Sequence, residues 1–214
     1  MLLLIDKPKG VTSHDVVDVI RKYSKERRVG HAGTLDPNAT GLLIVGVGRE
    51  DTKKLGSLTK DTTKTYIAEI VLGEARDTDD VEGKVIERDD KLQNIEKRKI
   101  EEVLNSFVGK QMQTPPAYSA IKLNGKKAYE LARKGQTVRL EPREIEVFEA
   151  RLLSYDFPTL SVEFHVSSGT YIRSLARDIA KKLGTVGYLS NLRRTKIGDY
   201  SIEEAKQLQY YSSR

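Results

Sequence analysis

The chain has 214 residues, of which 38% are hydrophobic and 32% charged, and this composition indicates a soluble, rather polar globular protein with a real core. Its net charge of +6 favours an anionic partner, nucleic acid first, although a lysine-rich solubilising surface would give the same total. The absence of cysteine excludes disulfides and thiolate catalysis, and three scattered histidines do not form a zinc motif. No apolar run is long enough to span a membrane and no signal peptide is recognisable, so we expect a cytoplasmic protein.

The first predicted elements are a short strand and a capped helix. Leu2–Ile5 is an apolar run typical of a buried strand, and a turn follows over 6–10. Thr12 is the predicted N-cap of a helix that runs to about Ser24, with Asp15 completing a capping box. Basic residues gather on this helix and after it, from Arg21 to Arg28.

A glycine-rich stretch over 27–41 precedes a strand predicted at 42–47. Three glycines and Pro37 predict a stiffened loop here, not a helix or a single strand. Asp36 directly precedes the proline, which disfavours its helical conformation, so the loop presents one carboxylate near His31. Such a loop is a candidate site, and a plain Asp-Pro turn is the equally weighted alternative on local pattern alone.

The middle of the chain alternates short elements with one acidic segment. The expected elements are a helix over 51–58, a strand over 63–72, a strand over 84–88 and a helix capped by Asn94. Residues 74–83 carry four acidic side chains between Asp77 and Glu82, and Val81 interrupts the spacing of a calcium-binding loop. We therefore predict a solvated acidic loop.

The last part of the chain begins with a change of character over 111–140. Its expected elements are an extended stretch over 114–120, a basic turn around Asn124 and Gly125, a short helix over 128–134, strands over 144–155 and 160–166, a helix over 170–183 ended by Gly184, a strand over 188–195 and a helical turn over 202–208. Strands and helices do not alternate regularly. The fold class is therefore α+β, with a mixed, largely antiparallel central sheet and flanking helices in one domain.

Ordered motifs along the whole chain resemble those of the TruB family of pseudouridine synthases. They are Asp6–Gly10 with Thr12 and Ser13, Gly30–Gly41, Lys64–Tyr66, Thr114–Lys122 with Gly125–Tyr129, Ser168–Leu175 and Leu192–Arg194. The resemblance implies a pseudouridine synthase catalytic domain over 1–214, with a thumb-like RNA-binding insertion at about 112–142. It also implies that the small C-terminal PUA domain of longer relatives is not included.

The resemblance also implies the roles of individual residues. Asp36 matches the catalytic carboxylate, Tyr66 the tyrosine that stacks on the uracil and accepts a proton, Tyr171 a second tyrosine close to both, and Arg173 the arginine that keeps the carboxylate ionised. His31 matches the residue that fills the space left by flipped nucleotides, and Leu192 an apolar wall of the pocket. Isomerisation of uridine needs no redox change or phosphate transfer, so we expect no cofactor and no metal.

The resemblance points to the bacterial type of enzyme, which converts uridine 55 in the T loop of tRNA to pseudouridine. The T arm would lie in a groove lined by basic clusters, with Lys122, Lys126, Arg193 and Arg194 among the phosphate contacts. We expect a monomer with no obligatory protein partner and no membrane. A guide-RNA-dependent synthase and a non-catalytic tRNA-folding chaperone are the alternatives.

Overall fold

The structure is a computed structural model that describes residues 1–123 and 125–211. Asn124, in the predicted basic turn, and residues 212–214, at the end of the predicted domain, lie outside the described residues. The chain divides into two compact units. The first comprises Met1–Ile67, Phe164–Ser168 and Asn191–Arg214, and the second comprises Ala68–Glu163 and Gly169–Ser190. The prediction of one domain over 1–214 stays a prediction.

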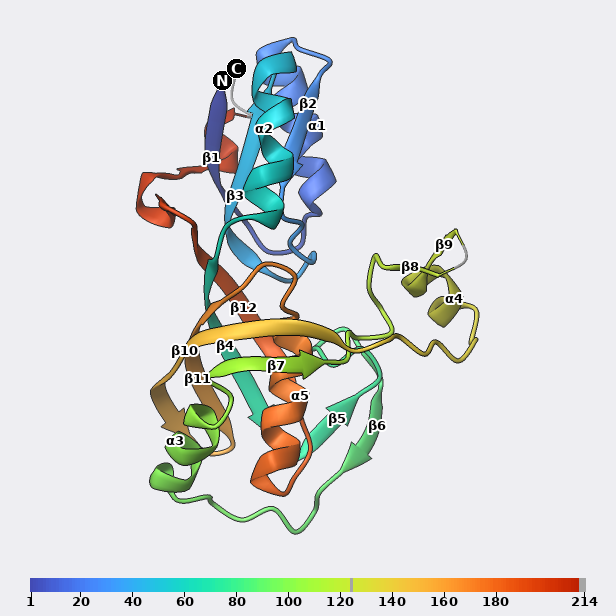
Figure 1. The fold of residues 1–214 in the computed structure, drawn as a ribbon, viewed down its shortest axis with the longest axis vertical. Helices are drawn as coiled ribbons and strands as arrows, with labels where there is room; N and C mark the ends of the chain where they lie inside the picture. Colours follow the sequence, from blue (N-terminus) through green and yellow to red (C-terminus); the bar gives the residue numbers. More distant parts are fainter. Residues whose placement is uncertain (124, 212–214) are drawn as a thin grey trace. The chain divides into compact units, whose positions relative to one another are not determined.

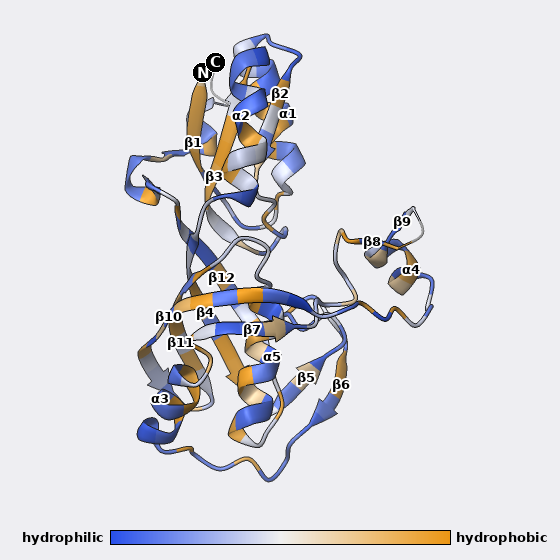
Figure 2. Ribbon diagram, viewed as in Figure 1, coloured by the Kyte–Doolittle hydropathy of each residue, from blue (hydrophilic) through white to orange (hydrophobic). Residues whose placement is uncertain are grey.

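The first unit is built around strands that form most of its core. Its elements are β1 (Leu2–Lys7), α1 (Ser13–Ser24), β2 (Val29–Ala32), β3 (Thr40–Val47), α2 (Arg49–Lys60), β13 (Tyr200–Ser201), β14 (Lys206–Gln207) and the 3-10 turns Ile202–Glu204 and Leu208–Tyr211. Strands β1 and β3 are apolar over most of their length (Figure 2), and Leu43 and Val45 pack against the buried face of α1. Thr12 and Asp15 form the predicted capping box.

The second unit packs two helices on its strands (Figure 1). Its elements are β5 (Glu74–Arg76), β6 (Val85–Arg88), α3 (Lys97–Asn105), β7 (Gly109–Gln113), β8 (Lys122–Leu123), β9 (Lys126–Lys127), α4 (Ala128–Arg133), β10 (Arg143–Asp156) and α5 (Ile172–Leu183). Helix α3 contacts both β10 and α5, and the apolar stripe of α5 is buried, including Leu175 and Ile179. Gly184 ends α5 in the left-handed conformation, as expected.

Strands β4 (Lys64–Leu72), β11 (Thr159–Val166) and β12 (Gly187–Ile197) contribute residues to both units. The described strands join in the order β14-β1-β3-β12-β4-β11-β10-β7, with β2 on β3 and β13 on β12. Strand β1 is antiparallel to β3, β2 to β3, and β7 to β10, whereas β14 is parallel to β1 and β12 is parallel to β3. The predicted class, α+β with a mixed and largely antiparallel sheet, is confirmed.

The predicted glycine-rich loop contains a strand that the sequence did not indicate. Residues Val29–Ala32 form β2 and pair with β3, so that Gly30 lies opposite Gly46. These two glycines make room for α2: a Cβ atom at Gly30 would lie 3.1 Å from the Leu55 side chain, and one at Gly46 would lie 2.9 Å from the Asp51 backbone. Gly30 was interpreted as a loop residue and Gly46 as part of the strand over 42–47, and together they allow close packing of a helix on a pair of strands.

Three other expected boundaries are also wrong. The helix after the acidic segment begins at Lys97, with Glu96 as N-cap, because the Asn94 side chain accepts a hydrogen bond from the Tyr155 hydroxyl at 2.8 Å. The acidic segment begins with β5, which pairs with β6. The expected helical turn over 202–208 is interrupted by β14, which pairs with β1.

We expect Gly41→Ala to destabilise the first unit strongly. Gly41 has a φ of +102°, and an added Cβ atom would lie 2.2 Å from the carbonyl oxygen of Arg194 on β12. The backbone of two paired strands cannot move apart cheaply, so the loss should exceed about 3 kcal/mol. Gly10→Ala is the matched control, because φ is +87° and no atom lies within 4 Å. It should cost about 1–2 kcal/mol, and equal losses in urea unfolding would contradict this interpretation.

Candidate active site

The Asp36 loop, residues 33–39 between β2 and β3, is fixed on the N-terminal side of Asp36. The Ser13 hydroxyl donates a hydrogen bond to the Leu35 carbonyl at 3.0 Å and accepts one from the Leu35 amide at 2.9 Å. The Leu35 side chain is buried, and the Ala39 amide donates to the Asp36 carbonyl at 3.0 Å. The first turn of α1 therefore holds the residue that precedes the carboxylate.

Lys7 fixes the other side of Asp36. Its ammonium group donates to the carbonyl oxygens of Pro8, Val11 and Pro37 at 3.0, 2.7 and 3.2 Å. The Gly10 amide donates to the same Pro37 carbonyl at 2.9 Å. The three acceptors match the three donors of an ammonium group, so the buried charge is fully hydrogen-bonded.

Burial lowers the pKa of Lys7 to about 8, and this is the largest of the opposing effects. Asp36 acts against it by raising the pKa, while Arg194 lowers it further. Lys7 therefore donates a hydrogen bond to the backbone of the Asp36 loop and also interacts electrostatically with the Asp36 carboxylate.

Arg194, on β12, links the Asp36 loop to Tyr66. Its Nη2 donates to the Gly33 carbonyl at 2.7 Å and its Nε donates to the Leu42 carbonyl at 2.8 Å. The guanidinium carbon lies 6.0 Å from the centre of the Tyr66 ring, at the limit of a cation–π contact. Because the Arg194 side chain is 1% exposed, its predicted place in an RNA groove is wrong.

The end of α2 supports the same loop. The Gly33 amide donates to the Thr59 hydroxyl at 3.2 Å, and the Thr59 carbonyl accepts from the ammonium group of Lys64 at 2.7 Å. Lys64 also donates to the Thr62 carbonyl at 2.7 Å, and burial lowers its pKa to about 8. Three buried cations, Lys7, Lys64 and Arg194, thus hold backbone carbonyls around one loop.

The other predicted residues of the first unit differ in their surroundings. His31 is half-buried on β2, and burial, followed by His14 and Arg194, lowers its pKa. Leu192 is half-buried on β12, and its carbonyl accepts from the Thr40 hydroxyl at 3.4 Å. Arg193 forms a bidentate ion pair with Asp6 at 2.8 and 3.0 Å, so any phosphate contact would compete with this pair.

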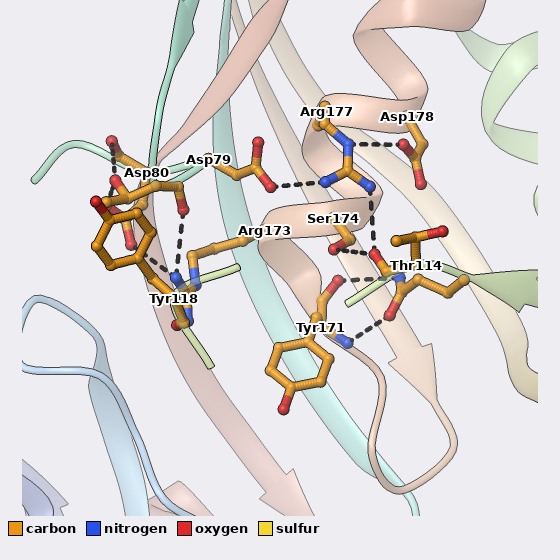
Figure 3. Close-up of polar contacts among 11 residues, drawn as sticks. Asp79, Asp80, Thr114, Tyr118, Tyr171, Arg173, Ser174, Arg177 and Asp178 are labelled. Carbon is orange, nitrogen blue, oxygen red and sulfur yellow. Dashed lines mark hydrogen bonds and ion pairs between the residues drawn. The ribbon is translucent and has the colours of Figure 1, made fainter. Parts of the chain in front are cut away.

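In the second unit, Arg173 lies in the first turn of α5 and is already held by other groups (Figure 3). Its guanidinium donates to the carbonyls of Thr78 and Tyr118 at 3.2 and 3.1 Å. It also lies 3.5 Å from the Asp80 carboxylate, whose other oxygen accepts from the Thr78 hydroxyl at 2.6 Å. Arg173 is 7% exposed, so its orientation is set by the protein.

Arg177 lies one turn further along α5 and pairs with Asp79 at 2.7 Å and Asp178 at 2.9 Å. It also donates to the Thr114 carbonyl at 3.3 Å. Burial raises the pKa of Asp79, whereas Arg177 and then Arg173 act to lower it. The prediction of a solvated acidic loop is therefore wrong for Asp79 and Asp80, which pair with the two arginines of α5.

Tyr171 caps the N-terminus of α5 and is held by β7. Its amide donates to the Gln113 side-chain oxygen at 2.9 Å, and its carbonyl accepts from the Gln113 amide nitrogen at 3.1 Å. In the next turn the Ser174 hydroxyl donates to the Thr114 carbonyl at 2.9 Å (Figure 3). The half-buried Tyr171 ring therefore projects from a fixed backbone.

The predicted insertion contains β8, β9 and α4, reached through two extended connections (Figure 1). Lys122 and Lys126 are exposed on the two short strands, which pair with each other. The half-buried Tyr129 ring lies 5.4 Å from the cationic groups of both Lys127 and Arg133. An aromatic ring among exposed cations suits a surface that binds phosphate and bases.

The predicted site residues fall into two groups. Asp36, Tyr66, His31, Leu192 and Arg193 belong to the first unit, and Tyr171, Arg173, Lys122 and Lys126 belong to the second. Over residues 1–123 and 125–211, no group of three or more acidic or histidine side chains could hold a metal ion. Within the same ranges, no helix is long and apolar enough to cross a membrane.

Sequence reasoning missed the residues that support these groups. Ser13, Arg194 and Gln113 act on backbone atoms, and nothing in a single sequence shows which carbonyl a distant side chain will meet. A signal did exist for Asp79 and Asp80. Arg173 and Arg177 are four residues apart beside the buried stripe of α5, so they needed acidic partners.

Solved structures share this fold. A chain of the archaeal box H/ACA sRNP Nop10–Cbf5 complex matches 99% of the residues with a TM-score of 0.72 and 26% identity. A chain of a Cbf5–Nop10–Gar1 complex matches 98% with a TM-score of 0.74 and 28% identity. The present chain spans 52% and 54% of those two chains, about half their length.

The family profile of the N-terminal domain of TruB family pseudouridylate synthases matches residues 21–172. The fold and this match define the class as pseudouridylate synthase. The chain belongs to the TruB family. It is 47% identical to the tRNA pseudouridine synthase B of Aquifex aeolicus, over 99% of this chain and 73% of that protein. The enzyme of the same name from Thermobifida fusca is 46% identical over 97% and 72%.

We expect the buried charge of Lys7 to make stability depend on pH in the alkaline range. The pKa of Lys7 is about 8 in the folded protein and 10.5 at its ordinary value, so between these values the unfolded chain binds more protons. The free energy of unfolding, relative to a Lys7→Met variant, should therefore rise from pH 8 to 10, by at most about 1.4 kcal/mol per pH unit.

Below pH 8 the variant removes the ammonium donors and leaves buried carbonyls unpaired, which should cost about 1–3 kcal/mol. Lys9→Met, which removes an exposed lysine of the adjoining turn, controls for the loss of one charge. Urea unfolding of the three proteins across this pH range measures the difference. A constant difference between wild type and Lys7→Met would contradict the assignment.

Proposed function

We propose that this chain is a tRNA pseudouridine synthase that isomerises uridine 55 in the T loop, with Asp36 as its catalytic carboxylate. The observation that carries the proposal is the Asp36 loop. Ser13, Lys7 and Arg194 hold its backbone at Leu35, Pro37 and Gly33. A single carboxylate on a loop fixed at three points has the preorganisation that a catalytic group needs. Relatives at 46–47% identity carry the name tRNA pseudouridine synthase B.

The chemistry suits a carboxylate. The reaction breaks the bond between N1 of uracil and C1′ of ribose, turns the base and joins C5 to C1′. C5 loses its proton and N1 gains one, so that no atom is gained or lost overall. An ionised Asp36 stabilises the positive charge that develops on the sugar, or forms a covalent bond with the substrate, as carboxylates do in glycosidases. Asp36 is regenerated at the end of the reaction, and the isomerisation requires no redox cofactor.

The remaining site residues receive roles that follow from their chemistry. The base must leave the RNA stack to be reached, and the Tyr66 ring gives it a face on which to stack. We assign proton acceptance at C5 to the Tyr66 hydroxyl and a second contact with the base to Tyr171. Arg173 keeps the Asp36 carboxylate ionised, Leu192 forms an apolar wall, and His31 faces the RNA in the place of the flipped nucleotides.

The partner in this proposal is the T arm of tRNA. Exposed Lys122 and Lys126 contact phosphates, and Arg193 adds a third contact if its pair with Asp6 opens. A monomer without a protein partner, a cytoplasmic location and a single catalytic domain with a thumb at about 112–142 remain our expectations from the sequence.

Two other functions make different predictions. A guide-RNA-dependent synthase is considered because one matched chain comes from an archaeal box H/ACA sRNP Nop10–Cbf5 complex and another from a Cbf5–Nop10–Gar1 complex. Such an enzyme should be nearly inactive when the purified chain is given a T-arm transcript alone. A tRNA-folding chaperone should bind and refold the RNA without forming pseudouridine.

Mapping pseudouridine in the T-arm transcript after incubation with the purified chain tests the proposal. If the chain binds the transcript but does not modify it, the proposal is overturned.

We expect Asp36→Asn to abolish pseudouridine formation and to leave RNA binding within about threefold of wild type. The substitution keeps the size of the side chain but removes the charge on which the chemistry depends. Asp199→Asn, which changes an exposed aspartate in the turn after β12, is the matched control and should be fully active. Tritium release from [5-³H]uridine RNA measures the reaction. Turnover by Asp36→Asn would exclude Asp36 as the essential carboxylate.

We expect RNA affinity to fall steeply with salt and the thumb to carry part of this dependence. Each phosphate contact contributes nearly one unit to the slope of log K against log salt. Lys122→Gln with Lys126→Gln should therefore reduce the slope by about 1–2. Lys53→Gln with Lys97→Gln removes two exposed lysines from α2 and α3 and serves as control. An unchanged slope in the thumb variant would contradict the phosphate contacts.

A further inference from the structure

His14 is an exposed histidine next to the residue that holds the Asp36 loop, and the proposed reaction gives it no role. It is the second residue of α1, directly after Ser13, whose hydroxyl is bonded on both sides to Leu35. Leu35 in turn precedes Asp36. The position of the His14 backbone is thus tied, through two adjoining residues, to the loop that carries the catalytic carboxylate.

The two imidazoles of this surface contact each other. The ring centres of His14 and His31 lie 6.2 Å apart at an interplanar angle of 85°, an edge-to-face arrangement. His14 is exposed, whereas His31 is half-buried and its Nδ1 is a buried atom for which the described residues offer no hydrogen-bond partner. The outer ring is therefore exposed to solvent and packs edge-to-face against the inner ring.

We infer that His14 is a second substrate-contacting residue of the proposed tRNA synthase, which donates a hydrogen bond from its imidazole to a phosphate of the bound RNA. This inference rests on the proposed function. The observation that carries it is the pairing of an exposed imidazole with His31, next to the clamp between Ser13 and Leu35. A solvent-facing ring that a neighbour holds in place loses little entropy when it binds.

The surroundings of His31 disfavour a positive charge on the inner imidazole. Arg194 of β12 and the burial of His31 both disfavour a charge on the inner ring, and His14 of α1 does so as well. The titratable neighbours of His14 are His31 from β2 and Asp15 on its own helix. The Asp15 carboxylate already accepts a hydrogen bond from the Thr12 amide at 2.7 Å. Imidazoles in general gain a proton between neutral and mildly acidic pH, and on an exposed ring the added charge can strengthen a hydrogen bond to a phosphate.

Affinity for T-arm RNA should consequently be higher at pH 6 than at pH 7.5, and His14 should cause much of the difference. Both values lie below the pKa of about 8 of Lys7 and Lys64, so the loop keeps its charges. His14→Gln retains a hydrogen-bond donor but cannot become charged. A charge-assisted hydrogen bond that is partly exposed is worth about 3- to 10-fold in affinity, and the variant should lose this factor at pH 6 and little at pH 7.5.

The experiment measures the Kd, KM and kcat of the full chain for a T-arm transcript at both pH values. His165→Gln, at the remaining histidine on β11, controls for protonation elsewhere and should keep the pH difference. The expected result is a raised Kd and KM for His14→Gln at pH 6, with kcat unchanged. Wild-type affinity at both pH values in His14→Gln, with an active wild type, overturns the inference alone. An inactive wild type overturns the proposed function instead.

Discussion

The fixed backbone around Asp36 depends on buried cations that bind carbonyl oxygens. A lysine or arginine taken out of water loses its hydration, and that loss is tolerable only when other groups satisfy its hydrogens. Lys7 has three carbonyl partners and Arg194 has two, and one partner of each, Pro37 and Gly33, lies in the Asp36 loop. The loop would therefore leave buried charges unpaired if it moved. The loop is rigid because any movement would leave these cations buried without hydrogen-bond acceptors, which is energetically unfavourable.

The second unit holds its arginine by a related device. Arg173 is bonded to two backbone carbonyls and approaches Asp80, while Arg177 joins Asp79, Asp178 and the Thr114 carbonyl. A guanidinium paired only with a flexible carboxylate could take several orientations. Two backbone carbonyls from separate segments restrict Arg173 to one orientation. Gln113 adds a similar constraint by gripping both backbone atoms of Tyr171. In both units side chains that bind backbone atoms therefore contribute to the positioning, and in the second unit the ion pairs of Arg177 with Asp79 and Asp178 add to it.

This distinction explains how far the sequence could predict the structure. Helix α1 with its capping box, the stripe and stop of α5, and the mixed sheet followed from local patterns, because capping and periodicity are properties of neighbouring residues. The helix start at Lys97 was missed because the Asn94 side chain bonds to the distant Tyr155 hydroxyl. Strand β2 was missed because the reason for Gly30, close packing against Leu55, is also distant in the sequence. Asp36 stood out from the local pattern of its loop, but the other candidate catalytic residues were reached only through the family resemblance. Ser13 and Arg194 lie within the family motifs, yet their role as supports, like that of Gln113, carries no local signature.

The charge balance around Asp36 also bears on how it could work as a catalyst. Asp36 raises the pKa of Lys7, so the cation is in turn a source of stabilisation for the carboxylate. Arg194 cannot leave to bind RNA, since its side chain is buried and its hydrogens hold Gly33 and Leu42. Positive charge is thus built into the first unit, behind the loop, before any substrate binds. Charge that the fold has already fixed in place does not have to be reorganised when a reaction begins, and this is the property that makes electrostatic stabilisation effective in an active site.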